Sequence, residues 1–300
     1  MTAVQTATWT AMTSEERAAF ERDGFLKVPG ALTADELARA QAAIGAEFEQ
    51  TRARRELDKL GAVHHLSAVT TCPDIAFLID HPNTLRYIWS LLGWNVHIYH
   101  SHVDVHPPLA EKRPFWWEWH QDGGRQNREI ETDPRPLLSV KVAYWFSDVS
   151  ETGRGNLMVV PGSHKTNWLP GPPSRGVEHE PPPGAIEVTG EPGDALIFDR
   201  RIWHARSDNY STFTRMASFI GYTYRWIQIR DKVADLPGNQ TWWDGLTPVQ
   251  RQLLGRCDGA ETSGHPMGDH WWGHDPKTVP LYGELAERGL LDPSYPPLIP

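Results

Sequence analysis

The chain has 300 residues, a formal net charge of −9 and two cysteines. A composition that is 39% apolar and 22% charged is typical of a soluble globular protein with a substantial core. The negative charge argues against a nucleic-acid partner, and no apolar stretch is long enough to span a membrane. Because there is neither a secretory signal pattern nor a disulfide framework, we expect a cytoplasmic protein; no feature predicts an oligomeric state.

Helical patterns dominate the N-terminal part of the chain. Thr13 and Thr33 each precede a glutamate by three residues, which is the capping-box pattern of a helix start. Residues 23–30, between the two caps, predict a short strand after a glycine turn. The apolar spacing after Thr33 predicts an amphipathic helix to about residue 58, and a second helix is predicted at 82–92.

After Gly93 the pattern changes to that of β-strands. Short apolar segments rich in β-branched and aromatic residues alternate with Gly, Pro, Asp and Asn. The predicted strands are residues 94–105, 115–122, 137–149, 155–164, 184–190, 194–199 and 215–224. Several short strands after a helical segment favour an antiparallel sandwich or jelly roll with helices packed outside.

The organisation along the chain predicts a single domain over residues 1–300. Residues 1–93 form a helical preface packed on the core, and residues 94–225 form the jelly-roll core. Residues 226–300 form a mixed, largely irregular C-terminal extension, in which residues 247–255 are expected to form a short helix.

His120-Gln-Asp122 offers two metal ligands in one predicted strand. Residues i and i+2 of a strand project from the same face, so this imidazole and this carboxylate could bind one ion. His204, which follows a Pro-Gly-Asp turn and a buried strand, offers a third ligand. Two histidines and one carboxylate that leave other positions open form the facial triad of non-haem Fe(II) oxygenases. The same triad could hold zinc and activate water.

A rival pair occurs earlier in the chain. His-x-Asp occurs twice, as His102-Val-Asp104 and His120-Gln-Asp122, in a sequence with 14 histidines. Because chance alone would produce such a tripeptide, the spacing does not choose between the two pairs.

The segment after His204 favours iron with 2-oxoglutarate over zinc. If residues 209–215 are extended, Ser211 and Arg215 share a face. Arg215 could then pair its planar guanidinium with the distal carboxylate of 2-oxoglutarate. A zinc hydrolase has no evident need for this arginine.

At this point the chain resembles the phytanoyl-CoA dioxygenase-like (PhyH-type) Fe(II)/2-oxoglutarate-dependent oxygenases, over roughly residues 13–225. The segments that carry the resemblance are, in order, FERDGFLKVPGALTADEL, WHQD, GRGNLMVVPGSHK and PGDALIFDRRIWHARSDNYSTFTR. The resemblance implies a mainly β fold, an α+β protein whose core is a double-stranded β-helix of the jelly-roll or cupin-like kind with flanking N-terminal helices. It also implies Fe(II) held by His120, Asp122 and His204, and 2-oxoglutarate bound by Arg215 with Ser211 beside it.

One departure from the family pattern stands next to the distal histidine. The family often has a small hydroxyl residue two positions after that histidine, where this chain has Arg206. The departure concerns the contacts to the cosubstrate and does not affect the three candidate ligands.

The resemblance further implies a 2-oxoglutarate-dependent dioxygenase that uses O2 to oxidise a small-molecule substrate, as in secondary metabolism. The carboxylate of Asp122 favours hydroxylation over halogenation, while desaturation, epoxidation and ring formation stay open. We expect the substrate to contact His102, Arg125, Gln126 and Trp117. The alternatives are a zinc-dependent hydrolase or lyase on the same barrel, and a non-catalytic ligand-binding jelly roll.

Overall fold

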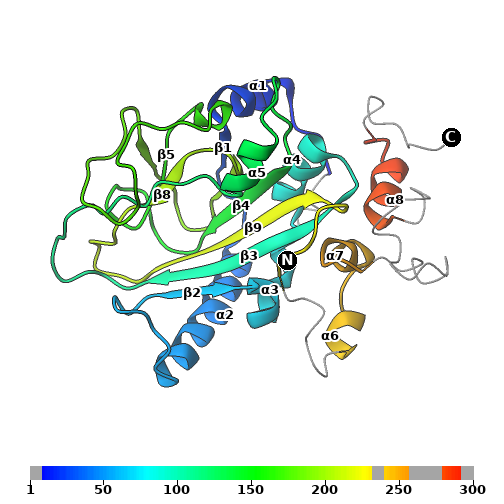
Figure 1. The fold of residues 1–300 in the computed structure, drawn as a ribbon. Coiled ribbons are helices and arrows are strands. Elements are labelled where there is room, and N and C mark those ends of the chain that lie inside the picture. Colours follow the sequence, from blue (N-terminus) through cyan, green and yellow to red (C-terminus); the bar gives the residue numbers. More distant parts are fainter. Residues whose placement is uncertain (1–8, 232–239, 257–278, 292–300) are drawn as a thin grey trace.

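The computed structural model describes residues 9–231, 240–256 and 279–291. A six-stranded antiparallel sheet, with strand order β1-β7-β4-β9-β3-β2, forms its centre (Figure 1). Its strands are β1 (Phe25–Val28), β2 (Val63–Leu66), β3 (Val96–His106), β4 (Ser139–Trp145), β7 (Ala195–Asp199) and β9 (Arg215–Tyr224). A three-stranded antiparallel sheet contains β5 (Leu157–Val159), β6 (Ile186–Val188) and β8 (His204–Arg206).

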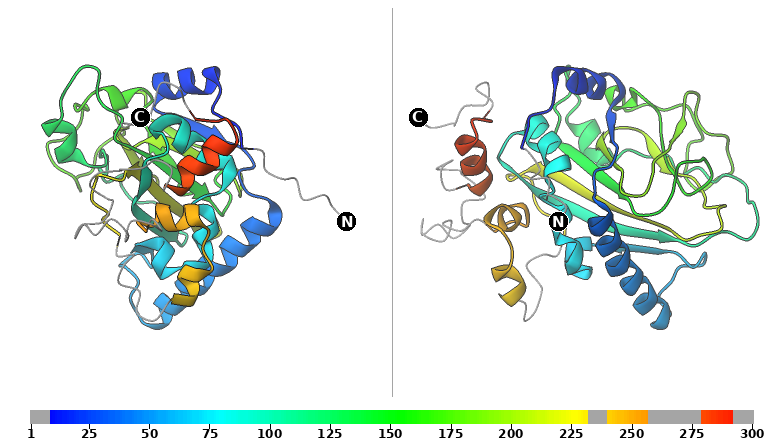
Figure 2. Two further views of the ribbon diagram at one scale, coloured as in Figure 1. Left: turned by 90° about the vertical axis from the view of Figure 1, so that its right-hand side faces the viewer. Right: turned by 180° about the vertical axis from the view of Figure 1, so that it is seen from behind.

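Helices pack outside this pair of sheets, as the jelly-roll prediction requires. The helix α2 passes behind the large sheet in Figure 1 and in front of it in the reversed view of Figure 2, and α7 and α8 lie together at one end. The helices are α1 (Ser14–Asp23), α2 (Ala34–Ala53), α3 (Ala68–Thr71), η1 (Pro73–Leu78), α4 (Pro82–Leu92), α5 (Gly124–Glu129), η2 (Ser163–Lys165), α6 (Gln240–Asp244), α7 (Pro248–Leu253) and α8 (Pro280–Glu287). Among these described helices, none combines the length and the apolar character that crossing a membrane demands.

Alternation along β4 separates two cores. Val142 and Tyr144 pack in the cluster that includes the helices, whereas Ala143 and Trp145 pack with side chains of the small sheet. Because successive side chains of a strand point to opposite faces, Lys141 shares the face of Ala143 and points between the two sheets. The space between the sheets therefore receives a buried charge from the large sheet.

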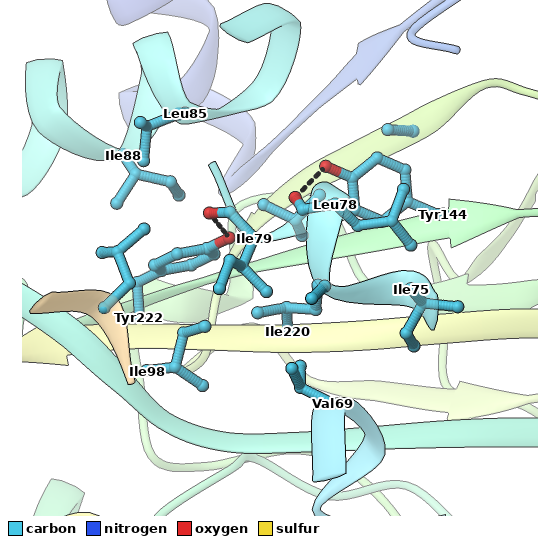
Figure 3. Close-up of a cluster of buried hydrophobic side chains, with 14 of the residues drawn as sticks. Val69, Ile75, Leu78, Ile79, Leu85, Ile88, Ile98, Tyr144, Ile220 and Tyr222 are labelled. Carbon is cyan, nitrogen blue, oxygen red and sulfur yellow. Dashed lines mark hydrogen bonds between the residues drawn. The ribbon is translucent and has the colours of Figure 1, made fainter. Parts of the chain in front are cut away.

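Two tyrosines form hydrogen bonds across the core between the large sheet and the helices (Figure 3). The Tyr222 hydroxyl donates to the backbone oxygen of Ile79 at 2.7 Å, and the Tyr144 hydroxyl donates to that of Leu78 at 2.9 Å. Ile220 lies among them with no exposed surface. The apolar contacts and the satisfied hydroxyls together fix the helices on the sheet.

Replacing Ile220 with alanine should lower the free energy of unfolding by about 2–5 kcal/mol, because the removed atoms leave a cavity in a packed core. Urea denaturation measures this change. Ile186→Ala is the matched control, since Ile186 is 44% exposed, and its cost should stay within about 0.5 kcal/mol. Equal losses in the two variants would contradict this description of the core.

The helix predictions are largely confirmed. Both predicted capping boxes are present, and the helix predicted at 82–92 is α4. The prediction that the helix after Thr33 reaches residue 58 is wrong: α2 ends at Ala53, and Arg55 then adopts a φ of 60°, which a helix cannot continue. Helix α7 matches the predicted short helix at 247–255, but α8 lies where irregular chain was expected.

The strand prediction is wrong for residues 115–122. This segment is extended but forms only isolated bridges, Trp116 with Glu178 and His120 with His204. The short helix α5 follows this segment directly. In addition, β1 and β2 from the N-terminal part join opposite edges of the large sheet. The pairing of β2 with β3 connects residues about 40 positions apart, which local sequence patterns do not reveal.

Candidate metal and cosubstrate site

A cavity of about 590 Å³ is lined by side chains from both sheets. His102 from β3, Lys141 from β4, His204 from β8 and Arg215 from β9 all reach it. His120 and Asp122 reach it too, from the extended segment before α5. The structure therefore brings together residues that are separated by more than a third of the chain.

The three predicted metal ligands lie side by side in this cavity. The backbones of His120 and His204 exchange two hydrogen bonds, of 3.0 and 2.9 Å, which fixes the two imidazoles next to each other. The Nε2 atom of His120 lies 3.9 Å from Asp122 Oδ1, and the Nε2 atom of His204 lies 3.7 Å from Asp122 Oδ2. Their ligand atoms all lie within 4.8 Å of one another, so one cation could contact all three.

Backbone carbonyls determine which nitrogen of each imidazole faces the cation position. His120 Nδ1 lies 2.9 Å from the Glu118 carbonyl oxygen, and His204 Nδ1 lies 2.9 Å from that of Ile202. Since a carbonyl only accepts, each Nδ1 carries the proton and each Nε2 keeps a free lone pair. Burial lowers the pKa of His120 to about 3 and also lowers that of His204, so both rings are neutral at pH 7 and able to bind a metal.

Lys141 holds the carboxylate of the group. Its Nζ atom lies 2.6 Å from Asp122 Oδ2, and the lysine is only 3% exposed. Burial alone would raise the pKa of Asp122, but the Lys141 ammonium, together with His204 and His120, outweighs burial and the pKa is lowered. Sequence reasoning missed this residue, although a single lysine within the apolar strand SVKVAYW was a signal.

Replacing Lys141 with methionine should destabilise the metal-free protein by about 3–5 kcal/mol, because it leaves the Asp122 charge buried without a partner. A divalent cation should restore more stability to this variant than to the parent protein, since the cation then compensates the carboxylate. Urea denaturation with and without Fe(II) under argon measures both effects. In an Asp122→Asn background the same change should cost much less; equal costs would contradict the pairing.

Arg215 is a buried cation whose N–H groups are not hydrogen-bonded to any described residue. It has no exposed surface, and its Nε, Nη1 and Nη2 atoms have no hydrogen-bond partner in the described part of the chain. Among the described residues, the nearest carboxylate oxygen is Asp104 Oδ2, which lies 3.9 Å from Nη1. Burial lowers the pKa of Arg215 to about 10, so it stays charged at pH 7. A buried guanidinium in this state is costly unless an anion joins it, which fits the distal carboxylate of 2-oxoglutarate.

A second group of possible metal ligands lines the same cavity. The rival pair His102 and Asp104 is joined there by His64 from β2. His64 Nδ1 lies 2.5 Å from Asp104 Oδ1, and this hydrogen bond raises the pKa of His64. A metal would have to break this bond and would lie near the Arg215 cation. The group of His120, which has two free Nε2 atoms, is therefore the better metal site.

Ser211, which was expected beside Arg215, does not line the cavity that Arg215 lines. Residues 211–213 bend instead of forming a strand, and the Ser211 hydroxyl donates to Asn209 Oδ1 at 2.7 Å. Ser211 lines a neighbouring cavity of about 660 Å³. The alternation that was assumed for residues 209–215 therefore does not apply to it.

The expected substrate residues are only partly placed in the cavity. His102 lines it, but Trp117 is 5% exposed and packs in a separate apolar cluster, while its neighbour Trp116 is 46% exposed and lines the cavity. Gln126 also lies elsewhere: it accepts a hydrogen bond from Arg200 Nη1 at 2.7 Å and lines another small cavity. The structure does not place Trp117 or Gln126 in this cavity, because the face that each segment presents was not known from the sequence. Arg125 is in α5, and its side chain lies outside the described structure.

The fold and the site define a class of protein: a jelly-roll oxygenase that depends on non-haem Fe(II) and 2-oxoglutarate. The model of the phytanoyl-CoA dioxygenase (PhyH) family matches residues 20–217. The chain belongs to this family.

Individual relatives agree with the family. The chain is 26% identical over 245 residues to the ectoine dioxygenase of Sphingopyxis alaskensis, covering 70% of this chain and 76% of the relative. It is similar in fold to the crystal structure of EctD from S. alaskensis with 2-oxoglutarate and 5-hydroxyectoine, with a TM-score of 0.56, 24% identity and coverage of 73% and 79% of the two chains. HygX from Streptomyces hygroscopicus, with nickel and 2-oxoglutarate bound, has a TM-score of 0.56, 18% identity and coverage of 76% and 95%.

Proposed function

We propose that His120, Asp122 and His204 bind Fe(II) and that Arg215 binds the distal carboxylate of 2-oxoglutarate, in an enzyme that hydroxylates a small organic substrate. The observation that supports this most is the fully buried Arg215 guanidinium, whose nitrogens have no hydrogen-bond partner in the described residues. A carboxylate there would satisfy donors that otherwise make burial costly.

Each protein group has a defined task in this proposal. His120 and His204 present neutral Nε2 atoms, and Lys141 keeps the Asp122 carboxylate ionised and in place. Arg215, which lines the same cavity, orients the cosubstrate through its distal carboxylate. When bound, the Fe(II) centre supplies the chemistry that couples oxidative decarboxylation of 2-oxoglutarate to succinate and CO2 with oxidation of the substrate.

The apolar wall of the cavity keeps water from the reacting groups. Leu157, Phe198 and Phe219 line the cavity and are each nearly inaccessible to solvent.

Because Asp122 provides a carboxylate ligand, no coordination position is freed for a halide. The proposed outcome is therefore hydroxylation rather than halogenation.

Release of succinate from 2-oxoglutarate tests the function. The purified protein should release succinate in the presence of Fe(II), 2-oxoglutarate and O2, and a coupled substrate should increase the rate. Ectoine, which names the curated relatives, belongs in the first panel of small organic compounds. A zinc-dependent hydrolase would leave 2-oxoglutarate unchanged, and a non-catalytic jelly roll would bind ligand without turnover; either result would reject the proposal.

A further inference from the structure

The cavity carries more cations than carboxylates, although the whole chain is acidic. Its cations are Arg113, Lys141, Arg175, Arg206 and Arg215, and its carboxylates are Asp104, Glu118, Asp122 and Asp208. The charges of Fe(II) and of the 2-oxoglutarate dianion cancel when both are bound. One positive charge therefore remains in the filled cavity, in a chain whose net charge is −9.

Three of the five cations are paired with carboxylates of the cavity. The pairs are Arg113–Asp208 at 2.6 Å, Arg175–Glu118 at 3.0 Å and Lys141–Asp122 at 2.6 Å. Arg215 is the proposed partner of 2-oxoglutarate. The fourth carboxylate, Asp104, lies 3.9 Å from Arg215. The cation that is left without a carboxylate in this count is therefore Arg206.

Arg206 lacks an ion-pair partner within the described ranges. No carboxylate oxygen of those residues lies within 4.0 Å of its guanidinium, and the hydrogen bond that it donates, to the Ser207 carbonyl, is long at 3.4 Å. Asp104 and Asp208 influence it only from greater distance, and Arg113 opposes its charge.

The position of Arg206 directs this charge toward the substrate. On β8 it lies two residues after His204, so both side chains point to the same face. Its strand neighbour across the small sheet is Leu157, which also lines the cavity. Unlike Arg215, Arg206 is only partly buried, so a molecule that enters after the cosubstrate can reach it.

Exposed apolar side chains line the same cavity. Leu60 is 40% exposed, Trp116 is 46% exposed, and Phe115 lies beside Trp116 in the sequence. Exposed apolar groups around a cavity provide contact area for the apolar part of a ligand. A single guanidinium provides a planar fork for one carboxylate.

We propose that Arg206 binds a carboxylate of the primary substrate, and that this substrate is a monoanionic organic acid with an apolar body. This inference rests on the proposed function, because the charge balance assumes Fe(II) and 2-oxoglutarate in the cavity. A monoanion neutralises the remaining charge, whereas an amide or an amine does not.

Binding of matched acids and amides to the protein loaded with Fe(II) and 2-oxoglutarate under argon tests the inference. The probes are 3-phenylpropanoate, indole-3-acetate and hexanoate, each compared with its amide by calorimetry and by the absorption of the iron–2-oxoglutarate complex. At least one acid should bind about tenfold more tightly than its amide, which corresponds to about 1.4 kcal/mol. Arg206→Gln should abolish this preference, and Arg206→Lys should retain part of it.

Arg175→Gln is the matched control, because it removes the same charge from the same cavity at a site already paired with Glu118. This variant should keep the preference for acids. The inference is overturned if no acid is preferred over its amide, or if Arg206→Gln weakens 2-oxoglutarate binding as much as it weakens binding of the acid. If the parent protein fails to bind Fe(II) with 2-oxoglutarate at all, the proposed function fails instead, and the absorption band distinguishes this result.

Discussion

Replacing His204 with alanine is expected to remove stoichiometric Fe(II) binding and to reduce succinate formation by more than about 100-fold. Removing a residue that is hydrogen-bonded to a metal ligand typically lowers metal affinity or activity by about 10- to 100-fold. The loss of a ligand itself should be larger. His204 offers a neutral Nε2 atom whose direction is fixed by the hydrogen bond of Nδ1 to the Ile202 carbonyl oxygen. Among the described residues, His120 is the one other imidazole of this ligand group, so no histidine is left to replace His204. Iron content by elemental analysis and succinate release measure the two effects.

His64→Ala is the matched control for this experiment. It removes one imidazole from the second group of possible ligands in the same cavity. If the site of His120, Asp122 and His204 holds the iron, His64→Ala should retain a full equivalent of metal. Loss of iron from His64→Ala, with iron retained by His204→Ala, would instead assign the metal to His64, His102 and Asp104.

The sequence could predict the grouping of His120, Asp122 and His204, because order and local spacing carried the information. Two residues that are two positions apart in extended chain share a face, and this holds for His120 and Asp122 although their segment is not a strand. His204 follows the apolar strand β7 and begins β8 in the small sheet. The isolated bridge between His120 and His204 holds the two imidazoles next to each other.

The other features of the cavity depend on contacts between distant segments, which local patterns do not contain. His64 reaches Asp104 only through the register of β2 on β3, in which these two residues are paired. Trp116 and Trp117 differ only in the face they present, and one lines the cavity while the other is buried. Lys141 was visible as a charge in an apolar strand, but its partner Asp122 depends on which face of the sheet is covered by the small sheet.

Arg215→Gln is expected to raise the KM for 2-oxoglutarate by about 100-fold, because hydrogen bonds between a guanidinium and a carboxylate contribute about 1.5–3 kcal/mol each and two would be weakened. Arg215→Lys should lose less, since it keeps the charge but not the planar fork. Initial rates of succinate release at varied 2-oxoglutarate measure the effect, and Fe(II) content should stay unchanged because Arg215 is not a candidate ligand.

A stability measurement separates a cosubstrate role for Arg215 from a structural one. In the ligand-free protein the buried guanidinium nitrogens have no hydrogen-bond partner in the described structure, so replacing them should not lower the free energy of unfolding in the way that losing a satisfied ion pair would. Added 2-oxoglutarate and Fe(II) should then stabilise the parent protein more than Arg215→Gln, since a ligand stabilises only the state that binds it. If the variant unfolds more readily without ligand and retains its KM, Arg215 supports the fold and another residue must hold the distal carboxylate.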